Sequence, residues 1–401
     1  MIKGKVIVLG ISGGIAAYKG AELARLFVKA EAEVHVVMTA HAQKFVTPLT
    51  FQSLTGNPVH TDLFDLYQEK EIGHISLADR ADLVVVAPCT ANLVGKVAAG
   101  LADDLLSTAL MATKAPVLFA PAMNVNMWEN PLYQRNQRIL TEAGYHFIDP
   151  VSGLLACGWE GKGKLADPEE IFFASQALLT EQDLAGETVL VTAGPTREEL
   201  DPVRYLSNYS SGKMGYAIAR AAILRGARVI LVSGPCALQP PAGAEFMAVT
   251  SAAEMYDQVL IRAGEATVII KAAAVADYRP VRRADQKVKK QDDSLNLQLE
   301  KTPDILAELG RRKGSALLVG FAAETENLLQ NAQAKLHAKQ LDLIVANDVS
   351  QPGCGFDAET NAVRILFADG HEVQVPQQSK ARVADRLLDE VVALRIKASD
   401  D

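Results

Sequence analysis

The sequence predicts an α/β protein with two doubly wound, Rossmann-like domains built on mainly parallel sheets. Strand-length apolar runs alternate with segments of helical period, which is typical of βαβ units. This alternation occurs twice along the 401 residues, and a chain of this length usually forms two domains. The runs are almost continuously apolar, as expected of parallel strands that helices cover on both faces.

The first half contains four runs that we expect to be strands, at 5–10, 34–39, 83–88 and 116–120. Asp167, which is followed by Pro-Glu-Glu, predicts the start of a helix that ends near Leu179. The polar stretch 180–183 then precedes a new strand pattern. We therefore place the domain boundary near residue 183, which gives domains 1–183 and 184–401.

The second half repeats this architecture. Its expected strands lie at 188–192, 228–233, 268–272, 316–321 and 343–346. A hairpin of 363–367 and 372–375 should follow, because Asp369-Gly370 is a strong two-residue turn signal. A helix from Ser379 to about Ile396 closes the chain. Two such domains without a sequence repeat indicate two reactions, or one reaction with two ligands.

Composition narrows the class of protein. Hydrophobic residues make up 49% of the chain, which excludes a disordered protein. A net charge of -8 argues against general binding to nucleic acid or to anionic membranes. The four cysteines lie far apart without C-x-x-C spacing, so neither a zinc site nor a disulfide framework is indicated. No apolar run is long enough to cross a bilayer, and we expect a cytoplasmic protein with reduced thiols.

A glycine-rich turn follows the first expected strand. Ser12, Gly13 and Gly14 open a helix, so backbone N–H groups can cradle a phosphate there. The spacing is not G-x-G-x-x-G, and the second strand ends in Thr39 rather than the acidic residue of an NAD site. The turn therefore favours a mononucleotide such as FMN, with the Thr39 hydroxyl as a second phosphate contact. A turn without a ligand is the alternative.

Two more strand ends carry candidate ligand contacts. Pro88, Thr90 and Asn92 follow the third strand, at the carboxyl edge where open α/β sheets bind ligands, so we assign them to the flavin site. Asn124 follows the fourth strand and offers an amide to a substrate carboxylate. Asparagine is also common in plain turns.

His74 and Cys157 are the candidate reactive side chains of the first half. His74 lies at a turn before an apolar helix, and histidine titrates near neutrality, which suits a general base. A surface or capping histidine would look the same. Cys157 is the one cysteine in an evident loop, and loops carry chemistry more often than cores do.

The second half has its own polar features. Lys213 is not part of a Walker A loop, because the required earlier glycine is missing and Met214 follows it. Asp277 is expected at the end of a buried strand, as a Mg²⁺ ligand between phosphates. A basic island then begins, and it either closes over a polyphosphate or forms a solvated loop. Its cations are Arg279, Arg282, Arg283, Lys287, Lys289 and Lys290. Lys335 and Lys339 share one helix face at i and i+4.

Four motifs in the first half resemble the flavin-dependent cysteine decarboxylase family. They are Ser12-Gly13-Gly14, Gly73-His74, Pro-Ala-Met-Asn at 121–124 and Ala-Cys-Gly at 156–158. Nearly the whole chain resembles the bacterial bifunctional phosphopantothenoylcysteine decarboxylase / phosphopantothenate-cysteine ligases of coenzyme A synthesis. In the second half the resemblance includes Gly-Phe-Ala-Ala-Glu-Thr at 320–325 and Ala-Asn-Asp at 346–348.

For the first half, the resemblance implies FMN-dependent oxidation of a cysteinyl thiol, loss of the adjacent carboxylate as CO₂, and reduction of the resulting enethiol. It implies that His74 is the base at the thiol and that Asn124 contacts the departing carboxylate. It also implies that Cys157 donates the final proton. Lys96 stands where some members carry arginine, which leaves its contact open.

For the second half, the resemblance implies that CTP activates 4′-phosphopantothenate as an acyl-cytidylate, which cysteine then attacks through its amine. Asn208 matches the residue needed to form that intermediate, and Lys287 the one needed to convert it to product. The implied CTP site consists of Lys271, Ala272, Ala273, Asp277, Lys287, Pro303, Asp304, Ile305, Leu306, Phe321, Lys335 and Lys339. The resemblance further implies a homo-oligomer, with trimers of the first domain and dimers of the second combining into a dodecamer.

Two other functions fit parts of the sequence. One is a flavin-dependent decarboxylase acting on the C-terminal cysteine of a peptide, although such an enzyme has no use for a nucleotide-activating second half. The other is a nucleotide-sensing regulator with two degenerate domains, although sensing does not require the reactive residues. A flavin spectrum separates the enzymes from the sensor, and CTP-dependent pyrophosphate release separates the two enzymes.

Overall fold

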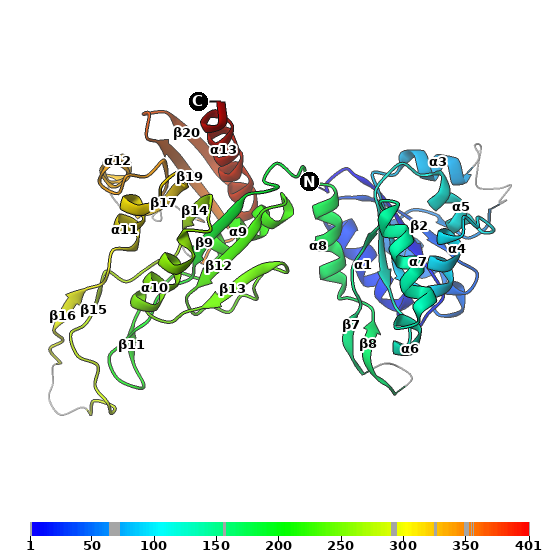
Figure 1. The fold of residues 1–401 in the computed structure, drawn as a ribbon, viewed down its shortest axis with the longest axis horizontal. Coiled ribbons are helices and arrows are strands. Elements are labelled where there is room, and N and C mark those ends of the chain that lie inside the picture. The colour runs from blue at the N-terminus through cyan, green and yellow to red at the C-terminus, as the bar shows by residue number, and fades with distance from the viewer. Residues whose placement is uncertain are drawn as a thin grey trace. The chain divides into compact units, whose positions relative to one another are not determined.

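The computed structural model describes residues 2–63, 73–154, 158–289, 295–324, 327–348, 353, 355 and 357–400. It divides into two compact units, Met1–Glu181 and Gln182–Asp401. Each unit has a twisted sheet with helices packed against it (Figure 1). The predicted fold class, α/β with mainly parallel sheets, is confirmed. None of the helices in the described part of the chain has the length and apolar character needed to span a membrane.

The first unit has a six-stranded parallel sheet in the order β3-β2-β1-β4-β5-β6. Its strands are β1 (Val6–Ile11), β2 (Glu33–Met38), β3 (Val59–His60), β4 (Leu83–Cys89), β5 (Val117–Pro121) and β6 (His146–Phe147). A separate antiparallel hairpin follows, formed by β7 (Val151–Leu154) and β8 (Glu160–Lys164). The order reverses at β1, which has β2 on one side and β4 on the other.

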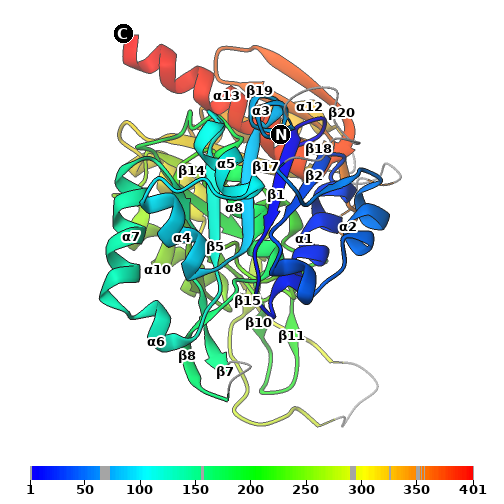
Figure 2. The same cartoon turned by 90° about the vertical axis from the view of Figure 1, so that its right-hand side faces the viewer.

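Helices cover both faces of this sheet, as Figure 2 shows for α1 and α4 to α8. One core lies under α1 (Ala17–Lys29), α2 (Pro48–Thr55) and α8 (Pro168–Leu178). The opposite core lies under α3 (Gly73–Arg80), α4 (Ala91–Ala98), α5 (Leu105–Ala112), α6 (Val125–Trp128) and α7 (Pro131–Glu142). A short 3-10 turn, η1 (Ala42–Lys44), follows β2. The continuous apolar character of β1 and β4 follows from burial on both faces.

The second unit has an eight-stranded sheet in the order β13-β12-β9-β14-β17-β18-β19-β20. Its parallel strands are β9 (Thr188–Ala193), β12 (Arg228–Ser233), β13 (Ala244–Ala248), β14 (Val268–Lys271), β17 (Leu317–Glu324) and β18 (Leu343–Asp348). The antiparallel edge is the predicted hairpin, β19 (Thr360–Phe367) and β20 (Glu372–Ser379). The order reverses between β9 and β14.

Within the described residues, five helices cover this sheet. α9 (Lys213–Leu224) and α13 (Lys380–Asp400) pack on one face, and α10 (Ala252–Ala263), α11 (Ile305–Arg312) and α12 (Leu328–Ala338) pack on the other. Two short ribbons lie outside the sheet. They are β10 (Glu198–Glu199) with β11 (Tyr205–Leu206), and β15 (Tyr278–Pro280) with β16 (Leu299–Lys301).

A buried arginine fastens the start of the second unit. The Arg225 guanidinium donates to both carboxylate oxygens of Asp183, at 2.8 and 2.5 Å, and to Asp389 of α13 at 2.8 Å. The Gln182 side chain donates to the carbonyl of Leu224 at 2.9 Å. The segment that follows residue 181 is therefore tied into the second unit from its first side chains onward.

One predicted strand end is wrong. β14 ends at Lys271, so Asp277 lies six residues beyond the strand rather than at its end. The chain leaves the sheet there to run along the loop after β9, where the Ala274 N–H donates to the Gly194 carbonyl at 3.0 Å. The Ala276 N–H likewise donates to the Thr196 hydroxyl at 3.0 Å.

Candidate functional sites

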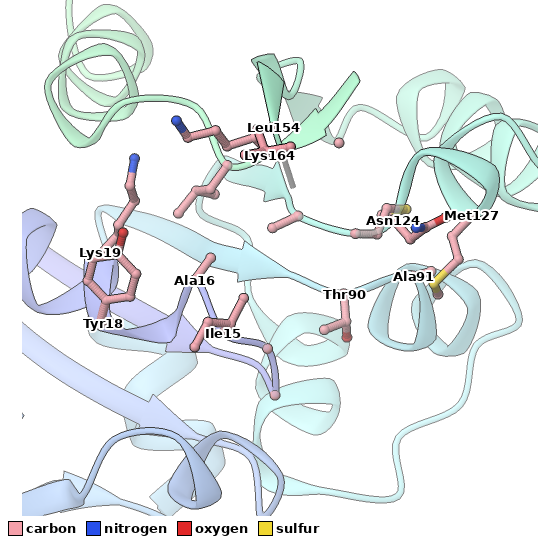
Figure 3. A pocket seen from close by; sticks show the side chains of 16 residues that line it. Ile15, Ala16, Tyr18, Lys19, Thr90, Ala91, Asn124, Met127, Leu154 and Lys164 are labelled. Carbon is pink, nitrogen blue, oxygen red and sulfur yellow. The ribbon is translucent and has the colours of Figure 1, made fainter. Parts of the chain in front are cut away.

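A cavity of about 490 Å³ opens at the carboxyl edge of the first sheet, where the strand order reverses. The loops after β1, β4 and β5 form its floor, and β7 and β8 cover it (Figure 3). Tyr18 and Lys19 lie at one end, and Thr90, Asn124 and Met127 lie at the other (Figure 3). The lining residues are Gly13, Gly14, Ile15, Ala16, Tyr18, Lys19, Thr90, Ala91, Ala122, Met123, Asn124, Met127, Leu154, Gly163, Lys164 and Leu165.

The two glycines of the first loop have different surroundings. A Cβ added at Gly13 would lie 2.3 Å from the His41 Cβ and 2.9 Å from the His41 carbonyl carbon. A Cβ added at Gly14 would meet nothing within 4 Å. Gly13 therefore allows close backbone packing, while Gly14 faces open space beside the amino end of α1, where an anion is favoured.

Ser12 ties this loop to the loop after β4. Its buried hydroxyl donates to the Pro88 carbonyl at 2.8 Å and accepts from the Thr90 N–H at 2.9 Å. Ser12 and Pro88 thus support the cavity from behind, while Thr90 lines it and caps α4. Asn124 lines the cavity as the cap of α6, and its Oδ1 accepts from the Asn126 N–H at 2.9 Å.

Other predicted residues of this unit lie outside the lining. The Thr39 hydroxyl accepts from the Ala42 N–H at 3.3 Å, and Asn92 is exposed on α4. Lys96 pairs with Asp103 at 2.6 Å and Asp104 at 3.0 Å, and the hydrogen bond to Asp103 is the main cause of its raised pKa. His74 is the second residue of α3 rather than part of a turn before it. Cys157 lies outside the described residues.

Sequence reasoning missed the covering hairpin and its cation. Lys164 of β8 and Lys19 of α1 both line the cavity. A Cβ at Gly163 would lie 2.3 Å from the Met123 carbonyl oxygen, and the Met123 N–H donates to the Gly163 carbonyl at 2.9 Å. The glycines at 161 and 163 allow this close approach. They were the signal in the sequence from which the hairpin could have been predicted.

A second cavity, of about 650 Å³, lies in the second unit beyond the end of β14. Eight residues of the predicted nucleotide site line it, and they are Lys271, Asp277, Pro303, Asp304, Ile305, Leu306, Lys335 and Lys339. The other lining residues are Val275, Tyr278, Lys301, Thr302, Ala334 and Ala338. The structure therefore brings together side chains from β14, α11 and α12 that lie far apart in the sequence.

The charges of this cavity are arranged around Lys271. Burial is the main cause that lowers the pKa of Lys271 to about 8, and the nearby Lys335 lowers it further, while Asp304 and Asp277 oppose the shift. Lys335 donates to the Phe321 carbonyl at 2.9 Å, and Lys339 pairs with Asp304. With Lys301, four lysines and two aspartates line this cavity, so it favours an anion.

Local hydrogen bonds hold the two aspartates. The Asp304 carboxylate caps α11 by accepting from the Ala307 N–H at 2.9 Å. The Asp277 carbonyl accepts from the Thr302 N–H at 3.0 Å, which joins the segment after β14 to the segment before α11.

The remaining predicted residues surround this cavity or lie near it. The Ala273 N–H donates to the Thr192 hydroxyl at 3.2 Å, next to Ala272, and Phe321 contributes the carbonyl described above. Asn208 donates from Nδ2 to the Ala274 carbonyl at 2.5 Å, so it is attached to the same segment as Asp277.

Lys287 is exposed in the loop after β15 and does not line the cavity. In the basic island, Arg279 pairs with Glu300 at 2.9 Å and Arg283 pairs with Glu199 at 2.5 Å. These two cations are thus engaged by carboxylates of the protein. Lys290 lies outside the described residues.

Comparison with known proteins identifies the family. Residues 1–180 match the model described as Flavoprotein, and residues 184–394 match the DNA/pantothenate metabolism flavoprotein C-terminal domain. The chain is 50% identical over 398 residues to the coenzyme A biosynthesis bifunctional protein CoaBC of Bacillus subtilis (strain 168), covering 98% of each chain. It belongs to the CoaBC family.

Two further comparisons cover the chain or its second half. The CoaBC protein of Haemophilus influenzae (strain ATCC 51907 / DSM 11121 / KW20 / Rd) is 47% identical over 393 residues, with 98% of each chain covered. A crystal structure of a CoaBC C-terminal domain is 42% identical, covers 55% of this chain and 100% of that chain, and has a TM-score of 0.47.

Family membership confirms the predicted identity. The chain is a bifunctional enzyme of coenzyme A biosynthesis, and the predicted pairing of a decarboxylase with a ligase is confirmed. Its first unit is a flavoprotein domain.

Proposed function

We propose that the first unit, 1–183 in the predicted division, decarboxylates phosphopantothenoylcysteine to 4′-phosphopantetheine with FMN. The second unit, 184–401, forms phosphopantothenoylcysteine from 4′-phosphopantothenate and cysteine at the expense of CTP. The observation that carries the proposal is the pair of cavities at the carboxyl edges of the two sheets, in a chain that belongs to the CoaBC family.

The first cavity fits FMN on the chemistry of its walls. Gly14 leaves open space beside the amino end of α1, which suits the phosphate. Ile15, Ala16 and Met127 offer apolar surface for a flavin ring, and Thr90 offers a hydroxyl. Ser12, Gly13 and Pro88 hold the loop that makes this wall, and Thr39 and Asn92 are proposed as outer contacts.

When bound, FMN supplies an electron sink that takes two electrons from the substrate thiol and later returns them. The chain's own residues handle the protons and the carboxylate. We propose His74 as the base that accepts the thiol proton, Asn124 as the amide that contacts the departing carboxylate, and Cys157 as the donor of the final proton. The place of Asn124 in the cavity lining supports this role.

The second cavity fits a nucleoside triphosphate with Mg²⁺. Lys271, Lys335 and Lys339 offset the negative charge of the phosphates. Their stabilising effect grows as negative charge develops on the departing pyrophosphate. Asp277 is the proposed Mg²⁺ ligand. Among the described residues no three His, Cys, Asp or Glu side chains form a protein-only metal site. A Mg²⁺ held by one carboxylate and the substrate phosphates needs no such cluster.

The ligation has two steps. In the first, a carboxylate oxygen of phosphopantothenate attacks the α-phosphorus of CTP, and pyrophosphate leaves with the bonding pair. In the second, the cysteine amine forms a C–N bond to the acyl carbon, the C–O bond to the cytidylate breaks, CMP leaves, and the nitrogen loses a proton. We propose Asn208 for the first step and Lys287 for the second.

The deciding experiment incubates the protein with phosphopantothenate, cysteine, CTP and Mg²⁺ and analyses the products by mass spectrometry. 4′-Phosphopantetheine should appear only when all three substrates are present, whereas pyrophosphate release should require CTP and phosphopantothenate. Decarboxylation of a peptide C-terminal cysteine without CTP dependence would instead support the peptide decarboxylase. A protein that holds no flavin after reconstitution would contradict the assignment of the first unit.

Cys157→Ser tests the proposed proton donor. The variant should still release CO₂ from supplied phosphopantothenoylcysteine but should accumulate the enethiol, because the final reduction lacks its proton. Mass analysis of the products separates the two steps, and a normal yield of phosphopantetheine would contradict the role.

We further propose a cytoplasmic homo-oligomer, with trimers of the first unit and dimers of the second combining into a dodecamer. Light scattering of the purified chain measures this directly, and a monomer would contradict it.

A further inference from the structure

The loop between β10 and β11 contains a carboxylate that is almost fully buried. Asp201 is 1% exposed and accepts five hydrogen bonds. Its Oδ1 accepts from the N–H groups of Val203 and Arg204, both at 2.8 Å. Its Oδ2 accepts from Arg204 Nε at 3.1 Å, Arg204 Nη2 at 2.6 Å and the Val288 N–H at 3.1 Å. The Arg204 guanidinium is the main reason that the pKa of Asp201 lies far below its ordinary value.

The same ion pair holds both backbone polar groups of Val288. Arg204 Nη2 donates to the Val288 carbonyl at 2.8 Å, while Asp201 accepts from the Val288 N–H. Val288 follows Lys287 directly in the chain. The exposed Lys287 side chain thus extends from a backbone that the buried Asp201 carboxylate fixes at the next residue, Val288.

The two loops run together over several residues. The Ala284 N–H donates to the Leu200 carbonyl at 2.9 Å, and Arg283 pairs with Glu199. The segments with β11 and β15 lie at one end of the second unit in both views (Figures 1 and 2). Of these described contacts, those that Asp201 and Arg204 make with Val288 involve the residue nearest in sequence to Lys287.

The segment that fixes the backbone next to Lys287 also carries Asn208. Asn208 comes four residues after Arg204 and is fixed to the Ala274 carbonyl at 2.5 Å. The segment 199–208 therefore carries Asn208, which the Ala274 carbonyl holds, and also fixes Val288, the residue that follows Lys287. Arg204 is suited to this because its planar guanidinium binds a carboxylate and a carbonyl at once, which a lysine ammonium does less well.

We propose that Asp201, acting through Arg204 and Val288, is a positioning residue for Lys287 in the second step of ligation. This proposal rests on the proposed function of the second unit. Asp201 touches no substrate. Its effect is to fix the backbone from which the Lys287 side chain extends, so that the ammonium meets the acyl-cytidylate when cysteine attacks.

The test is Asp201→Asn in the full chain. The amide oxygen can still accept from the Val203 and Arg204 N–H groups, but Nδ2 replaces the oxygen that accepts from the Val288 N–H. We expect pyrophosphate release with CTP and phosphopantothenate alone to stay within about twofold of wild type. Cysteine-dependent product should form about 10- to 100-fold more slowly, as expected for a misplaced catalytic group. The acyl-cytidylate should accumulate and be visible by mass spectrometry.

Arg204→Lys provides a second variant in case the asparagine weakens the loop. It keeps the positive charge but cannot hold Asp201 and the Val288 carbonyl together, so it should show the same split between the two steps. The double variant Asp201→Asn/Lys287→Gln should be no slower in the second step than Lys287→Gln alone, because the two changes remove the same function.

The matched control is Arg228→Lys. Arg228 makes a two-pronged ion pair with Glu245, at 2.6 and 3.0 Å, at the opposite, amino end of β12. Its replacement should leave both steps unchanged. Equal slowing of the two steps by Asp201→Asn, or no slowing of either, would overturn the positioning role. A wild-type protein that releases no pyrophosphate from CTP with phosphopantothenate would instead overturn the proposed function itself.

Discussion

The loop after β1 allows a sharp test because its two glycines differ in their surroundings. In Gly13→Ala, the new methyl would lie 2.3 Å from the His41 Cβ, about 1 Å inside ordinary carbon–carbon contact. It would also lie 2.9 Å from a backbone carbon, which a change of rotamer cannot relieve. Overpacking of this kind costs about 1–3 kcal/mol. For a unit of this size, each kcal/mol lowers Tm by about 2–4 °C.

The assay combines thermal unfolding with the flavin absorbance of the purified protein. Gly13→Ala should lower the melting temperature of the first unit and reduce the bound flavin, because the 12–14 turn must move away from η1. Gly14→Ala is the matched control, since its methyl meets no atom within 4 Å. Neither glycine has a φ in the left-handed region, so backbone strain does not separate them. Equal melting temperatures for the two variants would refute the argument.

Two further predictions concern the second unit. Asn208→Ala should abolish ligation while decarboxylation of supplied phosphopantothenoylcysteine survives, and equal loss of both activities would contradict the division of labour. Because the Lys271 pKa is about 8, CTP binding measured by calorimetry should weaken as pH rises through that value, and Lys271→Met should remove this dependence. Without nucleotide, the unfolded chain keeps the Lys271 proton up to its ordinary pKa of 10.5 while the native chain loses it near 8. Stability should therefore rise with pH in that interval, and chemical unfolding of Lys271→Met should lack this rise.

The sheet interiors could be predicted from the sequence, because burial on both faces leaves continuous apolar runs. β1, β4, β9 and β12 have ends within one residue of those expected. The edge strands β3, β6 and β13 were not predicted, because they are short or half-exposed and carry no such run. The hairpin of β7 and β8 was missed because its glycines weaken the alternation typical of a strand.

The candidate sites were predicted unevenly, for a physical reason. Strand ends and glycine turns are local features, so Gly14, Thr90 and Asn124 could be identified as ligand contacts from the sequence, and all three line one cavity. Contacts between distant loops are not local features. The pairing of Asp201 with Val288 depends on two loops that are 87 residues apart. The end of β14 was also misplaced, because alanines and valine after Lys271 continue the apolar pattern while the backbone leaves the sheet.

The anchoring of Gln182 and Asp183 by the second unit affects how the protein can be dissected. A fragment that starts at Gly186 would remove the two-pronged carboxylate partner of the Arg225 guanidinium, whose side chain is 8% exposed in the intact chain. Removal of one partner from a buried ion pair is strongly destabilising. An autonomous ligase fragment should therefore start no later than Gln182, and a protease site or a flexible insert intended to separate the halves belongs upstream of that residue.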